Sequence, residues 1–400
     1  NPCSAFTTGG NCPKGDHCTF SHVVKLYKVF PASSPKPQRH SNTSYNNQNN
    51  NPPMYPIKAV AIWENQGAIQ IFTGAEDGIW RLWNTANMSF NQVADKNMNG
   101  SVESLKVVSN HLFCGFSGPS PGVPDGQAGQ VNLWNLANPN EEIKLQMSPQ
   151  PPFRYAHNRT VTALEIMENQ GSPRIISGSE DGTIRVWTSQ NNAFALEKTL
   201  PGHAGKVTGL CAIPGGKHLW SSSTDGTLRI WDLTQPDATA FQHCISRETP
   251  APNNPQQGGA GGLGHSGEVT ALLPFAMNAG TFLISGSMDG YIKVWDSATG
   301  NCMASEPHGE GVVSMSVGTT QAGAQVLLIG LASGNIAVRN ILQTSKYPAF
   351  NLLVNLRQKY TAGHQWPVNT ITAGPAATFY TGGKDGNVMV WQLCGDLGLQ

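Results

Sequence analysis

From about residue 58 onward, short runs of alternating apolar and polar residues follow one another, separated by turn residues. The clearest runs begin with an Asp-Gly pair and close on a tryptophan, as in Asp181–Trp187 and Asp225–Trp231. A period of two is typical of a strand with one buried face, and Asp-Gly between two such strands favours a hairpin turn. The pattern therefore predicts a chain built mainly from β-hairpins.

The hairpins recur along the chain at 44 to 64 residues per unit. The clear copies end at Trp83, Trp187, Trp231, Trp295 and Trp391. Two further copies are degenerate: one ends at Trp134, with Ala128-Gly129 expected at its turn after a Gly/Pro-rich stretch from Gly118 to Gly126. The other ends at Arg339, with Ser333-Gly334 at its turn. Repetition at this period indicates a propeller, and we count seven units.

These repeats resemble the WD40 family, which implies an all-β, seven-bladed β-propeller over residues 58–394. One feature of the repeats could be mistaken for a hydrolase site, because each of four copies holds a histidine, a hydroxyl residue four positions before an Asp, and the Asp itself. An active site is not built four times around a ring, so we interpret these sets as structural. The resemblance implies that the histidine bridges the Asp to the hydroxyl and that the tryptophan closes the network. The four sets are His157, Ser177, Asp181 and Trp187; His203, Ser221, Asp225 and Trp231; His265, Ser285, Asp289 and Trp295; and His364, Thr381, Asp385 and Trp391.

Ahead of the repeats, three cysteines and a histidine lie within 20 residues, at Cys3, Cys12, Cys18 and His22. Three thiolates and an imidazole complete the tetrahedral shell of one structural Zn²⁺ and leave no position for a catalytic water. The spacing resembles the CCCH zinc-finger family over residues 1–23, and so short a unit needs the metal in order to fold.

The CCCH resemblance implies binding of single-stranded RNA. Phe6 and Phe20 would stack on unpaired bases and Lys14 would contact phosphate. A purely structural or protein-binding finger is the alternative for this motif.

The stretch between the finger and the repeats divides in two. Residues 24–30 are β-branched, aromatic and apolar enough for a strand, and we expect this strand to close the ring on the outside of the seventh blade. Residues 394–400 are the alternative for that position. Residues 31–57 are rich in Asn, Pro, Ser and Gln, which predicts a disordered linker. Glu248–Leu263 has a similar composition and is predicted to be mobile.

Charge and cysteine usage refine this picture. The net charge is zero, but residues 1–58 carry six lysines and arginines against Asp16 alone. The excess of five positive charges points any phosphate contact to the finger and the segment behind it. The five cysteines outside the finger are scattered, which favours a reducing compartment, the nucleus or cytoplasm. No apolar run approaches the length of a membrane span. Because the chain begins with Asn rather than Met, we expect it to be a fragment.

Together the two motifs resemble the plant CCCH zinc finger/WD40 (ZFWD) family. This resemblance implies a non-enzymatic RNA-associated adaptor whose ring recruits proteins on its top face, with Arg159, Lys206 and Trp366 as candidate contacts. The alternative is a protein scaffold, such as a substrate receptor of a ubiquitin ligase. Such receptors carry Trp-Asp-x-Arg at a repeat end, and neither Trp231–Thr234 nor Trp295–Ala298 contains that arginine. A propeller enzyme would need a non-repeated acid/base or metal cluster, which the repeats lack.

Overall fold

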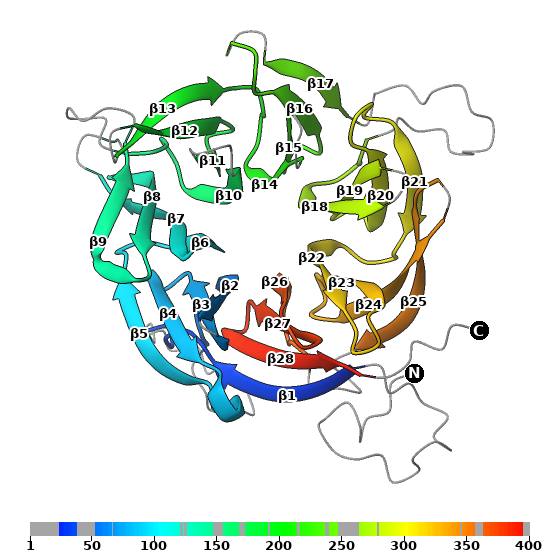
Figure 1. Cartoon of the computed structure of the whole chain (residues 1–400), viewed down its shortest axis with the longest axis horizontal. Helices are drawn as coiled ribbons and strands as arrows, with labels where there is room; N and C mark the ends of the chain where they lie inside the picture. Colours follow the sequence, from blue (N-terminus) through cyan, green and yellow to red (C-terminus); the bar gives the residue numbers. More distant parts are fainter. Residues whose placement is uncertain are drawn as a thin grey trace, which may run out of the picture.

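Antiparallel hairpins dominate the computed structural model, as the alternating pattern predicts. The structure describes residues 24–37, 53–65, 67–120, 123, 126–146, 155–167, 173–190, 193–213, 217–236, 240–246, 264–277, 280–344, 346–356 and 363–394. In these ranges the strands form seven four-stranded sheets, which are arranged around a central axis like the blades of a propeller (Figure 1). The prediction of an all-β, seven-bladed propeller is confirmed.

Each of the first three blades is a run of four consecutive strands. Blade 1 comprises β2 (Ile57–Asn65), β3 (Ala68–Ala75), β4 (Ile79–Asn84) and β5 (Asn91–Asn97), with a short 3₁₀ helix η2 (Ala86–Met88) between β4 and β5. Blade 2 comprises β6 (Val102–Val108), β7 (His111–Pro119), β8 (Gln127–Asn135) and β9 (Asn138–Leu145). Blade 3 comprises β10 (Val161–Met167), β11 (Arg174–Ser179), β12 (Ile184–Gln190) and β13 (Ala193–Leu200).

The remaining blades follow the same order, except at the last one. Blade 4 comprises β14 (Val207–Ala212), β15 (His218–Ser223), β16 (Leu228–Asp232) and β17 (Phe241–Ile245). Blade 5 comprises β18 (Val269–Met277), β19 (Gly280–Ser287), β20 (Tyr291–Asp296) and β21 (Cys302–Pro307). Blade 6 comprises β22 (Val312–Thr319), β23 (Gln325–Leu331), β24 (Ile336–Gln343) and β25 (Pro348–Leu356). Blade 7 comprises β26 (Val368–Ala373), β27 (Thr378–Gly383), β28 (Asn387–Leu393) and, as its outer strand, β1 (Val24–Pro31).

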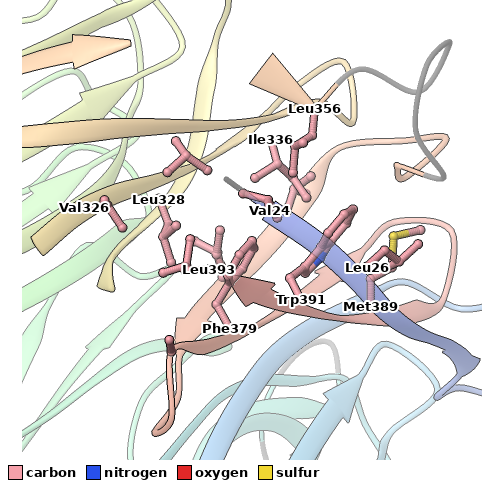
Figure 2. Packing of buried hydrophobic residues seen from close by; sticks show 14 residues of the cluster. Val24, Leu26, Val326, Leu328, Ile336, Leu356, Phe379, Met389, Trp391 and Leu393 are labelled. Atoms are coloured by element: carbon pink, nitrogen blue, oxygen red, sulfur yellow. The ribbon is translucent and has the colours of Figure 1, made fainter. Parts of the chain in front are cut away.

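The first strand of the chain therefore completes the last blade. β1 pairs antiparallel with β28, from Val24 opposite Leu393 to Pro31 opposite Asn387, and the two lie side by side in Figure 1. Val24 and Leu26 are buried in one apolar cluster with residues of blades 6 and 7. In Figure 2 Val24 lies near Ile336 and Leu356 of blade 6, and Leu26 lies beside Met389 and Trp391 of blade 7. Blade 7 therefore combines the first and the last strands of the described chain, and their pairing closes the ring.

Side-chain hydrogen bonds also join neighbouring blades around the central axis. At five junctions a side chain near the start of the inner strand donates a hydrogen bond to a backbone carbonyl of the next blade. The donor and acceptor pairs are Thr162 to Val207 (2.5 Å), Thr208 to Val269 (2.5 Å), Thr270 to Val312 (2.5 Å), Ser314 to Val368 (2.8 Å) and Asn369 to Ile57 (2.8 Å). The inner strands are thus tied to one another by side chains as well as by apolar packing. A recurring Val-Thr pair at residues 161–162, 207–208 and 269–270 is the sequence signal for this ring.

Two details differ from the sequence-based expectations. In blade 2 the dipeptide Ala128-Gly129 lies within strand β8, opposite Gly118 and Ser117, and the hairpin loop occupies the Gly/Pro-rich stretch before it. The prediction that this dipeptide forms the turn is wrong, because the longer loop lets the two strands extend their pairing past it.

The segment between β1 and β2 also differs, since residues 31–57 are ordered at both ends. Pro35 forms an antiparallel bridge with Met54, and Ala32 is buried. The linker prediction is therefore wrong for these ends, because Ser33 donates to the Tyr55 carbonyl at the other end of the segment and the Ser34 amide donates to Asp77 of blade 1. Residues 38–52 and the whole of the predicted mobile insert, residues 248–263, lie outside the described residues.

Candidate functional site

Blade 5 shows how the repeated His, Ser, Asp and Trp residues are arranged. His265 lies before the inner strand, Ser285 lies in β19, and Asp289 lies in the turn that follows β19. The Ser285 Oγ is 2.7 Å from His265 Nε2 and 2.8 Å from Trp295 Nε1. The opposite ring nitrogen, His265 Nδ1, is 3.0 Å from Asp289 Oδ2. The four side chains therefore form one continuous chain of hydrogen bonds.

The direction of every hydrogen bond in this chain follows from its two ends. The Trp295 indole can only donate, and the ionised Asp289 carboxylate can only accept. A neutral His265 must then donate from Nδ1 to Asp289 and accept at Nε2, so Ser285 donates its hydroxyl hydrogen to His265 and accepts from Trp295. All the polar groups are satisfied in this single arrangement, which is what a buried network needs in order to stabilise one conformation.

Two of the other three predicted sets, those of blades 4 and 7, are brought together in the same way. In blade 4, His203 is 2.8 Å from Ser221 and 3.1 Å from Asp225, and Trp231 is 2.9 Å from Ser221. In blade 7, Thr381 replaces the serine, at 2.8 Å from His364 and 3.0 Å from Trp391, and His364 is 3.0 Å from Asp385.

Blade 3 differs in one step. His157 Nε2 is 2.7 Å from the Ser177 hydroxyl, which accepts from Trp187 at 2.9 Å. His157 Nδ1, however, hydrogen-bonds to the Thr183 hydroxyl at 3.1 Å. Asp181 lies farther, at 3.5 Å from Nδ1, and accepts from the Thr183 hydroxyl at 2.5 Å. The Thr183 hydroxyl therefore extends the network by one member.

Burial sets the protonation of these groups. Burial lowers the pKa of His265, which favours the neutral ring. Burial alone would raise the pKa of Asp289, but the hydrogen bonds from His265 and from the backbone amides of Ser266 and Tyr291 outweigh this effect and hold the pKa well below its usual value. Burial likewise lowers the pKa of His157 and His203. The Ser285 and Thr381 side chains have no exposed surface. A hydroxyl that is sealed from solvent and already bonded to tryptophan cannot attack a substrate, so these sets are structural.

Blade 1 replaces the histidine with an arginine that the sequence analysis did not single out. Arg81 Nη2 is 2.7 Å from Asp77 Oδ2 and 3.0 Å from Ser34 Oγ, and the Ser34 amide donates to Asp77 at 2.8 Å. For Asp77, burial alone would raise the pKa, but these contacts lower it below its ordinary value. The segment after β1 is thereby fastened to blade 1. The spacing of four residues between Asp77 and Arg81 is the only signal of this pair in the sequence.

Blade 6 retains the histidine position but has lost the rest of the network. Ile329 stands where the hydroxyl residue would be, Ser333 where the Asp would be, and Arg339 in place of the tryptophan. Arg339 Nη1 forms an ion pair with Glu306 at 2.9 Å. Burial, with a smaller contribution from the charge of Arg339, lowers the pKa of His308 to about 4. Blade 6 therefore keeps its fold through apolar packing and this ion pair.

The loops that bear the repeat histidines and the Asp-Gly turns share one face of the ring, which we call the top face. Of the predicted partner residues there, Arg159 is exposed, and Trp366 is 58% exposed. Met288 (43%) and Tyr291 (41%) are further exposed apolar side chains of this face. Trp366 is thus exposed on this face rather than packed into the ring.

Lys206, the third predicted partner residue, is engaged within the ring. Its Nζ lies 3.8 Å from Glu103 Oε2, and Lys58 Nζ lies 3.4 Å from Glu103 Oε1. Burial alone would raise the pKa of Glu103, but the charges of Lys58 and Lys206 outweigh this effect and lower the pKa below its ordinary value. The three residues come from blades 1, 2 and 4, so this cluster depends on ring closure and could not be read from local sequence.

The candidate zinc ligands Cys3, Cys12, Cys18 and His22, and the candidate RNA contacts Phe6, Lys14 and Phe20, lie outside the described residues. Among the residues that are described, no group of three or more His, Cys, Asp or Glu side chains could hold a metal ion. The five cysteines in those ranges form no disulfide with one another. No helix of the described part is long and apolar enough to cross a membrane.

Two protein-family models match the chain. The model of the C-x8-C-x5-C-x3-H type zinc finger matches residues 1–24. The WD domain, G-beta repeat model matches residues 150–188, 194–232, 262–296 and 356–392. The four matched repeats correspond to blades 3, 4, 5 and 7, which are the blades with the complete polar network. The blades without that network are the three left unmatched.

Curated relatives are similar to parts of the chain at modest identity. Ribosome biogenesis protein ytm1 of Botryotinia fuckeliana is 22% identical over 331 residues, which is 82% of this chain and 58% of the relative. Nuclear distribution protein nudF of Emericella nidulans is 36% identical over 212 residues, 47% of this chain and 45% of the relative. Zinc finger CCCH domain-containing protein 17 of rice is 24% identical over 289 residues, 59% of this chain and 64% of the relative. The chain thus spans less than two thirds of the length of each.

Among solved structures, the computationally designed Ika8 protein has a similar fold. It aligns with a TM-score of 0.53 and 22% identity, over 84% of this chain and 96% of the designed protein. This likeness bears on the fold alone.

Proposed function

From a chain that joins an amino-terminal CCCH zinc finger to a ring of WD40 repeats, we propose a non-enzymatic, RNA-associated adaptor. One observation supports it most: the repeated Ser, His and Asp sets, which resemble a hydrolase site in composition, are buried and closed by tryptophan. WD40 rings and zinc fingers typically serve as non-catalytic scaffolds. The finger and the exposed surfaces of the ring are then left to carry function through binding.

In this proposal the finger binds a short stretch of single-stranded RNA. One structural Zn²⁺ would be held by Cys3, Cys12, Cys18 and His22, and it would supply the folding energy of a unit too small to bury a core. Phe6 and Phe20 would stack on unpaired bases, and Lys14 would contact phosphate. One relative is named for ribosome biogenesis, a process built on RNA, which supports this assignment.

The ring would recruit proteins over its top face. Trp366 is the most exposed large apolar side chain among the described residues, and exposed tryptophans are frequent anchors of interfaces. Met288 and Arg159 lie on the same face, whereas Lys206 would act chiefly through its contact with Glu103. We place the protein in the nucleus, the cytoplasm or both, because its free thiols suit a reducing compartment.

A protein scaffold without an RNA role is the second candidate. The exposure of Trp366 favours protein binding equally in both cases. The lack of an arginine after Trp231-Asp232 and Trp295-Asp296 disfavours a ubiquitin-ligase receptor of the Trp-Asp-x-Arg kind.

The test is binding of the purified, zinc-loaded chain to a randomised pool of 20-nucleotide single-stranded RNAs at fixed salt, compared with a Phe6→Ala/Phe20→Ala variant that retains zinc. We expect the variant to lose binding. Equal binding by both proteins would refute stacking by the finger, and no binding by the wild type would refute the RNA role.

A further inference from the structure

The outer strand of blade 7 differs in charge from the outer strands of the other six blades. β1 carries Lys25 and Lys28 and no carboxylate. The outer strands of blades 1, 2 and 3 each carry both signs, that of blade 5 carries a glutamate, and those of blades 4 and 6 carry neither lysine nor carboxylate. β1 is therefore the one outer strand with unbalanced positive charge.

The lysines on the mixed outer strands are also paired, unlike those of β1. Lys96 and Lys144 both approach Glu142, at 3.4 and 3.6 Å. In the described part of blade 7, Asp385 is the only carboxylate side chain, and it is engaged by His364 in the turn between β27 and β28. No described carboxylate forms an ion pair with Lys25 or Lys28, so their charge is available to an anionic ligand.

A β-bulge brings an aromatic side chain to this stretch. The register of β1 against β28 shifts between Leu26 and Lys28, which makes Tyr27 the extra residue. Five other blades have the same one-residue bulge on the outer strand, and its extra residue is Val93, Glu197, Gln242, Met303 or Leu353. Blade 7 alone has an aromatic residue there.

The bulge also exposes three consecutive residues, because it interrupts the alternation of the strand. Tyr27, Lys28 and Val29 all face solvent, and Tyr27 is 42% exposed. The Lys25 ammonium lies 5.6 Å from the centre of the Tyr27 ring, and the Tyr27 hydroxyl donates to Gln392. The aromatic ring of Tyr27 is therefore held on the outer rim of the propeller, with the positive charge of Lys25 beside it.

Chain connectivity places this stretch next to the finger. Val24 is 1% exposed and is anchored opposite Leu393. Only Val23 separates it from the candidate zinc ligand His22, so the two Cα atoms are at most about 8 Å apart, two Cα–Cα steps of 3.8 Å each. An RNA strand that leaves the finger in the direction of β1 meets Lys25 and Tyr27 first and Lys28 next.

We propose that Lys25, Tyr27 and Lys28, which we call the β1 stripe, form a second contact site for the single-stranded RNA held by the finger. This inference rests on the proposed function of the finger and adds a binding site on the propeller itself. The two ammonium groups would neutralise phosphates, and the Tyr27 ring would stack on a base. Surfaces that bind single-stranded nucleic acid without strict sequence preference usually combine basic side chains with aromatic rings.

The competing role for such lysines is protection of an outer strand from pairing with other chains. Protection requires only charge, and it does not require Tyr27 or proximity to the finger. RNA binding can therefore be separated from protection by a direct affinity measurement.

The experiment compares the zinc-loaded full chain with a Lys25→Gln/Lys28→Gln variant, using fluorescence anisotropy with the randomised 20-nucleotide single-stranded RNA pool. Each phosphate contact to a single strand contributes about 0.7 to the slope of log K against log salt. We expect the variant to reduce that slope by about 1.4 and the affinity by about tenfold at 0.15 M salt. A Tyr27→Ala variant should lose at least about fivefold in affinity with an unchanged slope, because stacking does not release counterions.

The matched control is Lys96→Gln/Lys144→Gln, which removes the same charge from the outer strands of blades 1 and 2. It should leave affinity and slope unchanged, and circular dichroism of every variant shows whether the ring is intact. One outcome would refute the β1 stripe while the function of the finger stands. In that outcome the wild type binds RNA, the Phe6→Ala/Phe20→Ala variant does not, and the β1 variants bind as tightly as the wild type. Equal losses in the control and the β1 variant would also refute it, since only net charge would then matter. If the wild type fails to bind, or the Phe6→Ala/Phe20→Ala variant binds equally, the proposed function fails as well.

Discussion

Substitution of Ser285 by alanine isolates the structural role of the polar networks. The Ser285 hydroxyl accepts from Trp295 Nε1 at 2.8 Å and donates to His265 Nε2 at 2.7 Å. The alanine variant would leave one donor and one acceptor without a partner, both inside a site with almost no exposed surface. The volume change is one oxygen atom, so the cost comes from hydrogen bonding rather than from a cavity.

The magnitude follows from the number of unpaired groups. A buried polar group that loses its partner costs about 1–3 kcal/mol, and two are created here. We expect the free energy of unfolding to fall by about 3 kcal/mol, since the vacated space lets the neighbours relax in part. With an unfolding entropy of about 2.1 cal/mol/K per residue, this loss lowers the melting temperature of a ring of this size by roughly 4 °C.

The assay is thermal unfolding followed by circular dichroism, with Ser305→Ala as the control. Ser305 lies in β21 of the same blade but is exposed, so its removal should change the melting temperature by less than about 1 °C. A melting temperature for Ser285→Ala within 1 °C of the wild type would refute the claim that these networks stabilise the blades.

Three further predictions concern the closing strand, pH and zinc. Leu26→Ala should lower the free energy of unfolding by about 2–4 kcal/mol because Leu26 is buried in the apolar cluster of blades 6 and 7, whereas Val29→Ala on the exposed side should cost far less; equal effects in denaturant titrations would contradict this. Burial lowers the pKa of His157, His203 and His265, so the unfolded chain binds more protons than the folded one below pH 6.5. Stability should be complete above pH 6.5 and fall below it, by up to about 1.4 kcal/mol per pH unit for each histidine, and a constant unfolding midpoint between pH 7.5 and 5 would overturn this reading. Chelation of zinc should abolish RNA binding while the near-ultraviolet signal of the buried tryptophans persists, and elemental analysis of the untreated chain should find one zinc per chain; RNA binding that survives chelation would argue against the finger.

The fold could be predicted from sequence where the repeat carries its full set of residues. An Asp-Gly pair followed by alternation and Trp231 specifies a turn, a strand and a buried partner for Ser221, all within a few residues. Blade 2 shows the limit of this logic. There the turn was assigned to Ala128-Gly129 by analogy with the other repeats, although a Gly/Pro-rich insertion had moved the loop to the residues before it.

Contacts that depend on ring closure were beyond prediction from sequence. Lys58, Glu103 and Lys206 lie far apart in the chain and meet only because three blades converge on the central axis. Polar residues that look like linker in the sequence can likewise be ordered by a distant partner, as Ser34 is by Arg81. Local composition does not contain that information.

RNA binding by the finger and the β1 stripe should be tested by ultraviolet crosslinking of the zinc-loaded chain to the single-stranded RNA pool, with the modified peptides mapped by mass spectrometry. We expect crosslinks at Phe6 or Phe20, with further ones at Tyr27. Crosslinks confined to the top face around Trp366, or none on any of these aromatic residues, would contradict this expectation.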